Sequence, residues 1–62
     1  MAGKAHFEVY FDRRKAPRFR LKAPNGEIIL VSEAYSSKQQ AINGIEAVKK
    51  YALDAEIQDI TK

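Results

Sequence analysis

Residues 25–50 read NGEIILVSEAYSSKQQAINGIEAVKK and contain a turn, the most apolar strand and the only convincing helix of the chain. Asn25 and Gly26 both tolerate positive φ, which the tight primed turns between antiparallel strands require. We therefore expect residues 18–23 and 27–33, on either side of this turn, to pair as a hairpin.

The second strand of this hairpin, residues 27–33, carries aliphatic side chains on both of its faces. Ile28 and Leu30 are expected to join one layer, and Ile29 and Val31 to face the other side. A strand that is apolar on both faces is normally covered on both. Because a single helix covers only one face of a sheet, Ile29 and Val31 are the candidate dimer-facing residues.

The helix is expected to begin at residues 36–40, with either serine as N-cap and a glutamine three residues later completing a capping box. Apolar residues then recur at helical spacing and predict a stripe that packs on the sheet, formed by Ala41, Ile42, Ile45, Val48 and Ala52. Gly44 lies inside this helix at a cost of about 1 kcal/mol relative to alanine. It indicates either close packing of the backbone or local tolerance.

One further strand is expected earlier in the chain, at residues 6–12, because apolar and polar side chains alternate there as they do in residues 18–23. Between them, residues 13–17 are charged and end in proline, which suits a loop or the first residue of an edge strand. The two strands would share an apolar face made of Phe7, Val9, Phe11, Phe19, Leu21 and Ala23. After the helix, residues 55–61 are expected to form a short last strand or an arm that crosses to a partner.

The 62 residues are expected to form a single β-β-β-α domain over 1–62, with flexible ends at about 1–5 and 61–62. This length is close to the lower limit at which a hydrophobic core offsets the entropy of ordering the backbone. The chain has no cysteine and one histidine, so it has neither a disulfide framework nor a zinc site to stabilise it. We therefore expect an α+β homodimer that holds no cofactor.

Membrane insertion is not expected, because the longest aliphatic run, residues 28–31, is far shorter than the roughly 20 residues that cross a bilayer. Residues 1–6 lack the apolar stretch of a secretory signal, and the absence of cysteine fits a reducing compartment. These features favour a cytoplasmic location.

The net charge of +3 is distributed unevenly along the chain. Residues 13–22 contain six basic residues and no acidic one, whereas the remaining chain contains five basic and eight acidic residues, which makes a +6 segment in a −3 body. With a neighbouring aromatic residue, this segment forms a candidate face for nucleic acid or another polyanion, composed of Tyr10, Arg13, Arg14, Lys15, Arg18, Arg20 and Lys22.

A structural interpretation of the basic segment is preferred to nucleic-acid binding. Tyr10 is the only aromatic residue on this face, whereas RNA-binding sheets generally display two or three. The basic face is therefore expected to be solvated, or to pair across a dimer with acids such as Glu8, Glu56 and Asp59.

No set of residues in the sequence forms a reaction centre. Ser36 and Ser37 would need His6 as a base, and it lies far away in the sequence, so helix capping is the better interpretation. The acidic residues of the strands have no spacing that indicates acid–base catalysis. We therefore expect a non-enzymatic interaction module without a small-molecule substrate, with nucleic-acid binding as the alternative.

The most distinctive sequence elements are NGEII at 25–29, YSSK at 35–38 and NGIEAVK at 43–49. On these elements the chain resembles the YegP-like family of small uncharacterised bacterial proteins, over nearly its whole length. The resemblance implies a β-β-β-α unit, which some members carry twice in tandem and single-copy members pair as homodimers. It implies no established activity, cofactor or catalytic residue.

The chain departs from the family pattern at two loops. It has Ala16 and Pro17 where the family often has glycine, and Ala34 before Tyr35 where the family often has glycine. Both departures concern local loop geometry and leave the expected fold unchanged. Tyr35 is expected to pack over the edge of the sheet, because a buried tyrosine normally places its hydroxyl group on a nearby partner. Glu33 or Ser36 is expected to satisfy the backbone at the corner between strand and helix.

Overall fold

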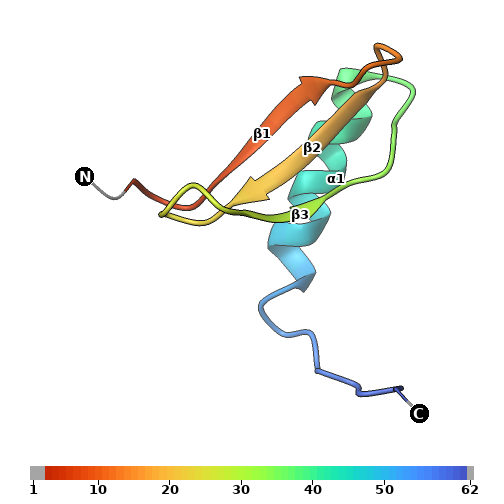
Figure 1. Ribbon diagram of the computed structural model, residues 1–62. Helices are drawn as coiled ribbons and strands as arrows, with labels where there is room; N and C mark the ends of the chain where they lie inside the picture. The colour runs from red at the N-terminus through yellow and green to blue at the C-terminus, as the bar shows by residue number, and fades with distance from the viewer. Residues whose placement is uncertain (1–2, 62) are drawn as a thin grey trace.

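The computed structural model describes residues 3–61, so residues 1–2 and 62 of the predicted flexible ends lie outside the described chain. Three strands precede one helix in the order β1 (His6–Phe11), β2 (Pro17–Lys22), β3 (Ile28–Val31) and α1 (Lys38–Tyr51). The strands form one antiparallel sheet in the order β1-β2-β3, and α1 lies across one of its faces (Figure 1). The predicted three-stranded meander with a helix packed on the sheet is therefore confirmed.

The core lies between α1 and the first two strands. The strand register places three pairs of mainly apolar residues on the face that α1 covers: Phe7 opposite Leu21, Val9 opposite Phe19, and Phe11 opposite Pro17. Phe19, in the central strand, is buried together with Ala41 and Ile45 of α1. The helix packs against β1 and β2 and does not reach β3.

Gly44 allows α1 to approach the central strand closely. Its position faces the stacked rings of Phe19 and Tyr35, whose centroids are 6.1 Å apart. A Cβ atom on Gly44 would lie 2.5 Å from the Tyr35 hydroxyl oxygen and 3.0 Å from Cε2 of Phe19. Close backbone packing is therefore the reason for this glycine, and Tyr35 packs on the central strand.

Ser37 caps the amino end of α1, so the second of the two candidate serines is the N-cap. Its Oγ accepts a hydrogen bond from the Gln40 backbone N–H at 3.1 Å. The Gln40 side chain accepts in return from the Ser36 backbone N–H at 3.2 Å, one residue earlier than in a standard capping box. The predicted apolar stripe is confirmed up to Val48, whereas Ala52 follows the helix and is exposed.

A β-bulge changes which side chains of β3 lie on each face. Leu30 lies opposite Leu21, in the layer that α1 covers, but Ile28 lies opposite Lys22, so Ile29 is an extra residue between the two pairs. The expectation that Ile28 shares a layer with Leu30 is wrong, because the extra residue interrupts the alternation of side chains. Ile28 instead lies on the face turned away from α1, hereafter the outer face.

The turn between β2 and β3 differs from the predicted primed turn. Gly26 has a positive φ of 89°, but Asn25 does not share this conformation. The Ala23 carbonyl accepts from the Gly26 N–H at 2.9 Å, and the Asn25 side chain accepts from the Glu27 N–H at 3.0 Å. The predicted hairpin is confirmed, and it closes through a turn with one left-handed glycine.

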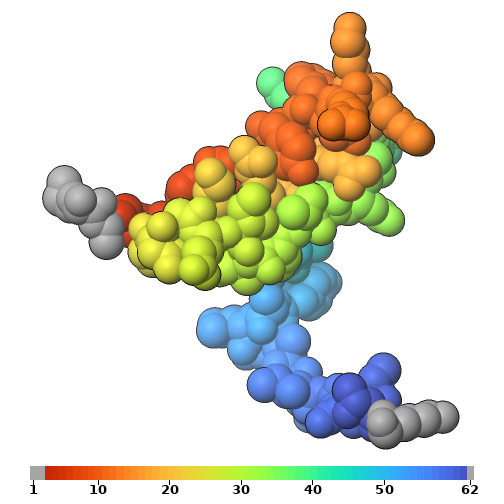
Figure 2. All heavy atoms as spheres, viewed as in Figure 1, coloured from red at the N-terminus to blue at the C-terminus, as the bar shows by residue number. Residues whose placement is uncertain are grey.

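The segment after α1 leaves the body of the molecule. Residues 55–61 form no strand within the chain and extend away from the sheet, as the blue atoms of Figure 2 show. Ile57 and Ile60 are 98% and 85% exposed. Of the two expectations for this segment, a strand within the chain is wrong, and an arm that meets a partner stays a prediction.

Candidate interaction surfaces

The basic residues of β2 are paired with acids on the outer face. Nε of Arg20 donates to Oε1 of Glu8 at 2.7 Å, and Nζ of Lys22 lies 3.7 Å from the same oxygen. Nε of Arg18 donates to Oδ2 of Asp12 at 2.7 Å. The structure therefore brings Arg18, Arg20 and Lys22 together, as predicted from alternation, but within a ladder of opposite charges.

The aromatic member of the predicted face is covered by one of these bases. The guanidinium carbon of Arg20 lies 4.5 Å from the centroid of the Tyr10 ring, in cation–π geometry. This contact occupies one face of the Tyr10 ring, which is therefore not free to stack on a nucleic-acid base. Tyr10 thus belongs to the charge ladder.

Glu8 is the centre of the ladder and accepts from a residue of its own strand, β1, and from a residue of β2. Nε2 of His6 lies 2.9 Å from Oε2 of Glu8, while Arg20 contacts the other oxygen. The hydrogen bond from His6, followed by that from Arg20, lowers the pKa of Glu8 to about 2. The same contact with Glu8 raises the pKa of His6 above its ordinary value.

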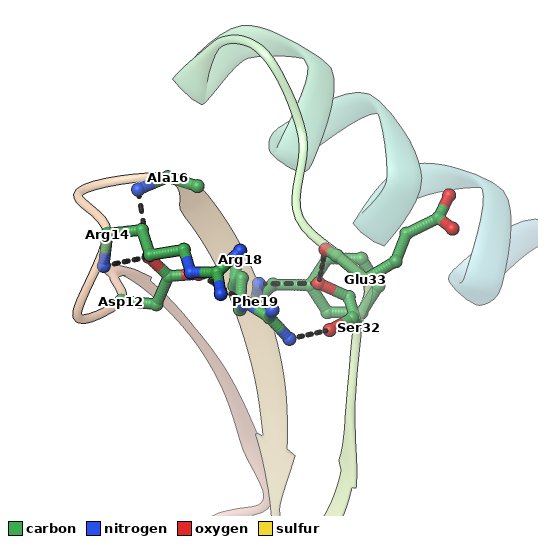
Figure 3. A network of polar contacts seen from close by, with 7 residues as sticks. All are labelled: Asp12, Arg14, Ala16, Arg18, Phe19, Ser32 and Glu33. Carbon is green, nitrogen blue, oxygen red and sulfur yellow. Dashed lines mark hydrogen bonds and ion pairs between the residues drawn. The ribbon is translucent and has the colours of Figure 1, made fainter.

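The loop between β1 and β2 is held in one conformation by Asp12. Its Oδ1 accepts from the backbone N–H groups of Arg14 at 2.8 Å and Ala16 at 2.9 Å (Figure 3). The Asp12 N–H also donates to the Ala16 carbonyl at 2.9 Å, and its carbonyl accepts from Lys15 at 2.8 Å. The N–H of Ala16 and then the Arg18 guanidinium lower the pKa of Asp12.

The three remaining bases of the predicted face project from this loop. Arg13, Arg14 and Lys15 are exposed, and none of them forms an ion pair with another residue of the described chain. The structure thus divides the basic segment into two parts, a ladder on the outer face whose bases are paired with Glu8 and Asp12, and a loop whose bases form no ion pair in the described chain. We call residues 13–15 the basic loop.

Ser32 connects the hairpin to the segment that leads into α1. Its Oγ accepts from the Phe19 N–H at 2.9 Å and donates to the Glu33 carbonyl at 2.8 Å. Nη1 of Arg18 donates to the Ser32 carbonyl at 3.1 Å, which joins this corner to the Asp12 network (Figure 3). Sequence reasoning missed both Asp12 and Ser32, although aspartate just before a turn is a known signal for bonds to the following backbone.

The candidate dimer-facing residues are exposed. Ile29 and Val31 are 58% and 50% exposed, and Val31 lies opposite Arg20 on the outer face. Ile28 and Leu30 are also exposed, because α1 does not extend over β3. The whole of this short edge strand therefore presents apolar surface.

Within residues 3–61 no three histidine, cysteine, aspartate or glutamate side chains gather where they would hold a metal ion, and no cavity opens. The single described helix is too short and too polar to cross a membrane. The exposed features of the described chain are the charges of the basic loop and the apolar side chains of β3 and residues 55–61.

The fold and these surfaces can be compared with known proteins. Residues 12–59 match the family described as Domain of unknown function (DUF1508). The chain belongs to this family. DUF1508 has no assigned activity, so membership transfers no catalytic or ligand-binding residue to this domain, and the predicted resemblance to YegP-like proteins is confirmed.

Relatives of this DUF1508 domain differ in length. A UPF0339 protein of Treponema denticola is 53% identical over 60 residues, which are 97% of this chain and 100% of the relative. The UPF0339 protein YegP of Yersinia pestis is 41% identical over 58 residues, which are 94% of this chain and 52% of the relative. The chain thus spans about half the length of that second relative.

Solved structures share the fold. An NMR structure of a protein from Haloferax volcanii has a TM-score of 0.84 and 46% identity, with coverage of 92% of this chain and 97% of that chain. An NMR structure of a protein from Agrobacterium tumefaciens has a TM-score of 0.77 and 41% identity, with coverage of 90% of each chain. The β-β-β-α unit is therefore common to these relatives.

Proposed function

We propose that this DUF1508 domain is a small, non-enzymatic interaction module that works as a homodimer. The observation that carries the proposal is the imbalance of its apolar side chains. Among the described residues only Phe19, Ala41 and Ile45 are buried hydrophobics, whereas ten large hydrophobic side chains are exposed. A 62-residue chain with so small a core is near the limit of independent stability, so a partner that buries more apolar surface stabilises it.

The β3 strand is the first surface that a second copy would cover. It lies at the edge of the sheet, and exposed apolar edge strands associate readily with other chains unless they are covered. Val31 and Ile28 lie beside the charge ladder on the outer face, so an apolar contact there would have a polar rim. This arrangement supports association through β3.

The last residues form the second surface. Ile57 and Ile60 project from an extended segment, and nothing in residues 3–61 covers them. A second copy supplies the same exposed β3 strand and the same segment, so that two copies can cover each other's apolar residues symmetrically. The resemblance to a family in which longer members carry the unit twice agrees with pairing of two such units.

Sedimentation equilibrium at micromolar concentration tests the proposal. The unchanged chain is expected to be a dimer, and Ile29→Glu/Val31→Glu is expected to shift it to a monomer, because charges are costly to bury in an apolar contact. Asn43→Glu/Ala47→Glu adds the same number of charges on the exposed side of α1 and serves as the matched control. A stable monomer of the unchanged chain at this concentration would refute the proposal.

Salt dependence separates the homodimer from the polyanion-binding alternative. An apolar interface is little weakened by salt, whereas contacts to phosphates are strongly weakened. The pairing of Arg18, Arg20 and Lys22 with Glu8 and Asp12 argues against the sheet face as a nucleic-acid surface. A dimer that persists at high salt is therefore expected.

A further inference from the structure

The basic loop differs from the rest of the basic segment because its charges are not compensated. Each of the three bases on β2 is within 4 Å of a carboxylate oxygen, but Arg13, Arg14 and Lys15 have no such partner in residues 3–61. The nearest acid in the sequence, Asp12, is already engaged by two backbone N–H groups and by Arg18. The loop therefore carries three free positive charges.

The loop is also ordered before any partner arrives. Asp12 closes it with side-chain and backbone hydrogen bonds, so its backbone has a defined shape. Figure 2 shows the orange side chains of this region projecting from the top of the molecule, at the end opposite the blue terminal segment. A fixed loop loses little conformational entropy on binding. Three weak charge contacts therefore contribute more to the net binding free energy than they would from a disordered loop.

The backbone of Lys15 strengthens this interpretation. Its φ is +64°, a conformation that favours glycine and costs other residues roughly 1 kcal/mol or more. A lysine at this position adds a charge to the loop tip at the expense of local strain. Strain of this kind is often found where a side chain takes part in binding.

The end of the molecule that carries the basic loop also carries the amino end of α1. The Tyr35 N–H donates to the Pro17 carbonyl at 2.8 Å, so the segment that enters α1 begins beside the end of the loop (Figure 1). The first turn of α1 contains Lys38 and no acidic residue. The positive end of the helix dipole therefore adds to the field at this end of the molecule and nothing in that turn opposes it.

We infer that the basic loop, Arg13, Arg14 and Lys15, contacts the phosphate backbone of nucleic acid. The partner fits a nucleic acid better than an acidic protein, because Ala16 is half-buried and Pro17 buried, which leaves the loop without an apolar centre for a protein interface. Phosphate contacts need no such centre. Because phosphate contacts carry no information about the bases, this binding is independent of base sequence.

Fluorescence anisotropy with a short labelled single strand and a duplex tests this inference. The unchanged chain is expected to bind both at low salt, with an affinity for the duplex that falls by about 0.9 log units per log unit of salt for each phosphate contacted. Arg13→Gln/Arg14→Gln/Lys15→Gln is expected to weaken binding roughly tenfold or more, because it removes the contacts. The same fold must be retained, as checked by circular dichroism.

The matched control removes three positive charges elsewhere. Lys4→Gln/Lys49→Gln/Lys50→Gln changes the net charge equally and is expected to leave the affinity within about twofold of the unchanged chain. An equal loss in both variants, or no binding by the unchanged chain at low salt, would overturn the inference. Equal affinity for polyglutamate would also overturn it, in favour of an acidic protein. The loop variant is expected to remain a dimer in sedimentation equilibrium. A loss of nucleic-acid binding by this variant is then not caused by a loss of dimerisation.

Discussion

Gly44 determines how closely α1 approaches the central strand. Gly44→Ala is expected to destabilise the fold by about 1–3 kcal/mol, because the new methyl group would lie 2.5 Å from the Tyr35 hydroxyl oxygen and 3.0 Å from Phe19. The gain of about 1 kcal/mol in helix propensity offsets only part of this cost. Thermal unfolding followed by circular dichroism measures the difference.

A second substitution locates the cause of this destabilisation. Gly44→Ala/Tyr35→Phe is expected to recover part of the loss, because the hydroxyl group nearest to the new methyl group is removed. Asn43→Ala, on the exposed side of the same turn, is the control and is expected to change stability by less than about 0.5 kcal/mol. Equal stability of Gly44→Ala and the unchanged chain would contradict the close packing.

Lys15 has the only positive φ among the described residues other than glycine. Lys15→Gly is expected to stabilise the chain by about 0.5–1 kcal/mol, since glycine adopts this conformation without the clash of a Cβ atom. Arg14→Gly, one residue earlier and without positive φ, is expected to destabilise it by a similar amount through backbone entropy. Urea unfolding of the three proteins tests this order of stability. A Lys15→Gly variant with a lower free energy of unfolding than the unchanged chain would refute it.

At the scale of the elements, the charge ladder joins β1 to β2 and makes their pairing dependent on pH. The pKa of Glu8 falls from its ordinary value of 4.5 to about 2, mainly through the hydrogen bond from His6. A lowered pKa means that the folded state favours the charged form, so the contribution of Glu8 is complete above pH 4.5 and is lost as the pH falls toward 2. Asp12 acts in the same direction, because its pKa is also lowered.

Urea unfolding between neutral and acid pH measures this contribution. We expect stability to fall on acidification, and Glu8→Gln to show a smaller fall because it no longer titrates. The raised pKa of His6 acts in the opposite direction, with a contribution that is complete below pH 6.5 and lost as the pH rises through the raised value. An unchanged acid dependence in Glu8→Gln would show that Glu8 does not contribute.

For the whole molecule, the exposed apolar surface leads to a dependence of stability on concentration. If the folded chain is a dimer, each tenfold increase in concentration is expected to stabilise it by about 1.4 kcal/mol, and the melting temperature rises accordingly. Ile57→Glu/Ile60→Glu is expected to reduce this dependence, because both side chains are nearly fully exposed in the single chain. A melting temperature that is constant over a hundredfold dilution would contradict dimerisation.

The basic segment was predicted only in part from the sequence. Alternation correctly placed Arg18, Arg20 and Lys22 on one face, because side chains in a strand follow a period of two. Their pairing with Glu8 and Asp12 depends on the register between strands, which alternation does not specify. The distinction between the paired bases of β2 and the bases of the basic loop therefore came only from the structure.

Local spacing and turn chemistry were enough to predict the order of the elements, the hairpin at Gly26 and the apolar stripe of α1. The folded structure was needed to find the bulge at Ile29, the close approach of the backbone at Gly44 and the exposure of β3. Each of these depends on how the strands and the helix pair and pack together, which local propensity does not specify. The exposure of β3 follows from the position of α1, which packs on β1 and β2 alone.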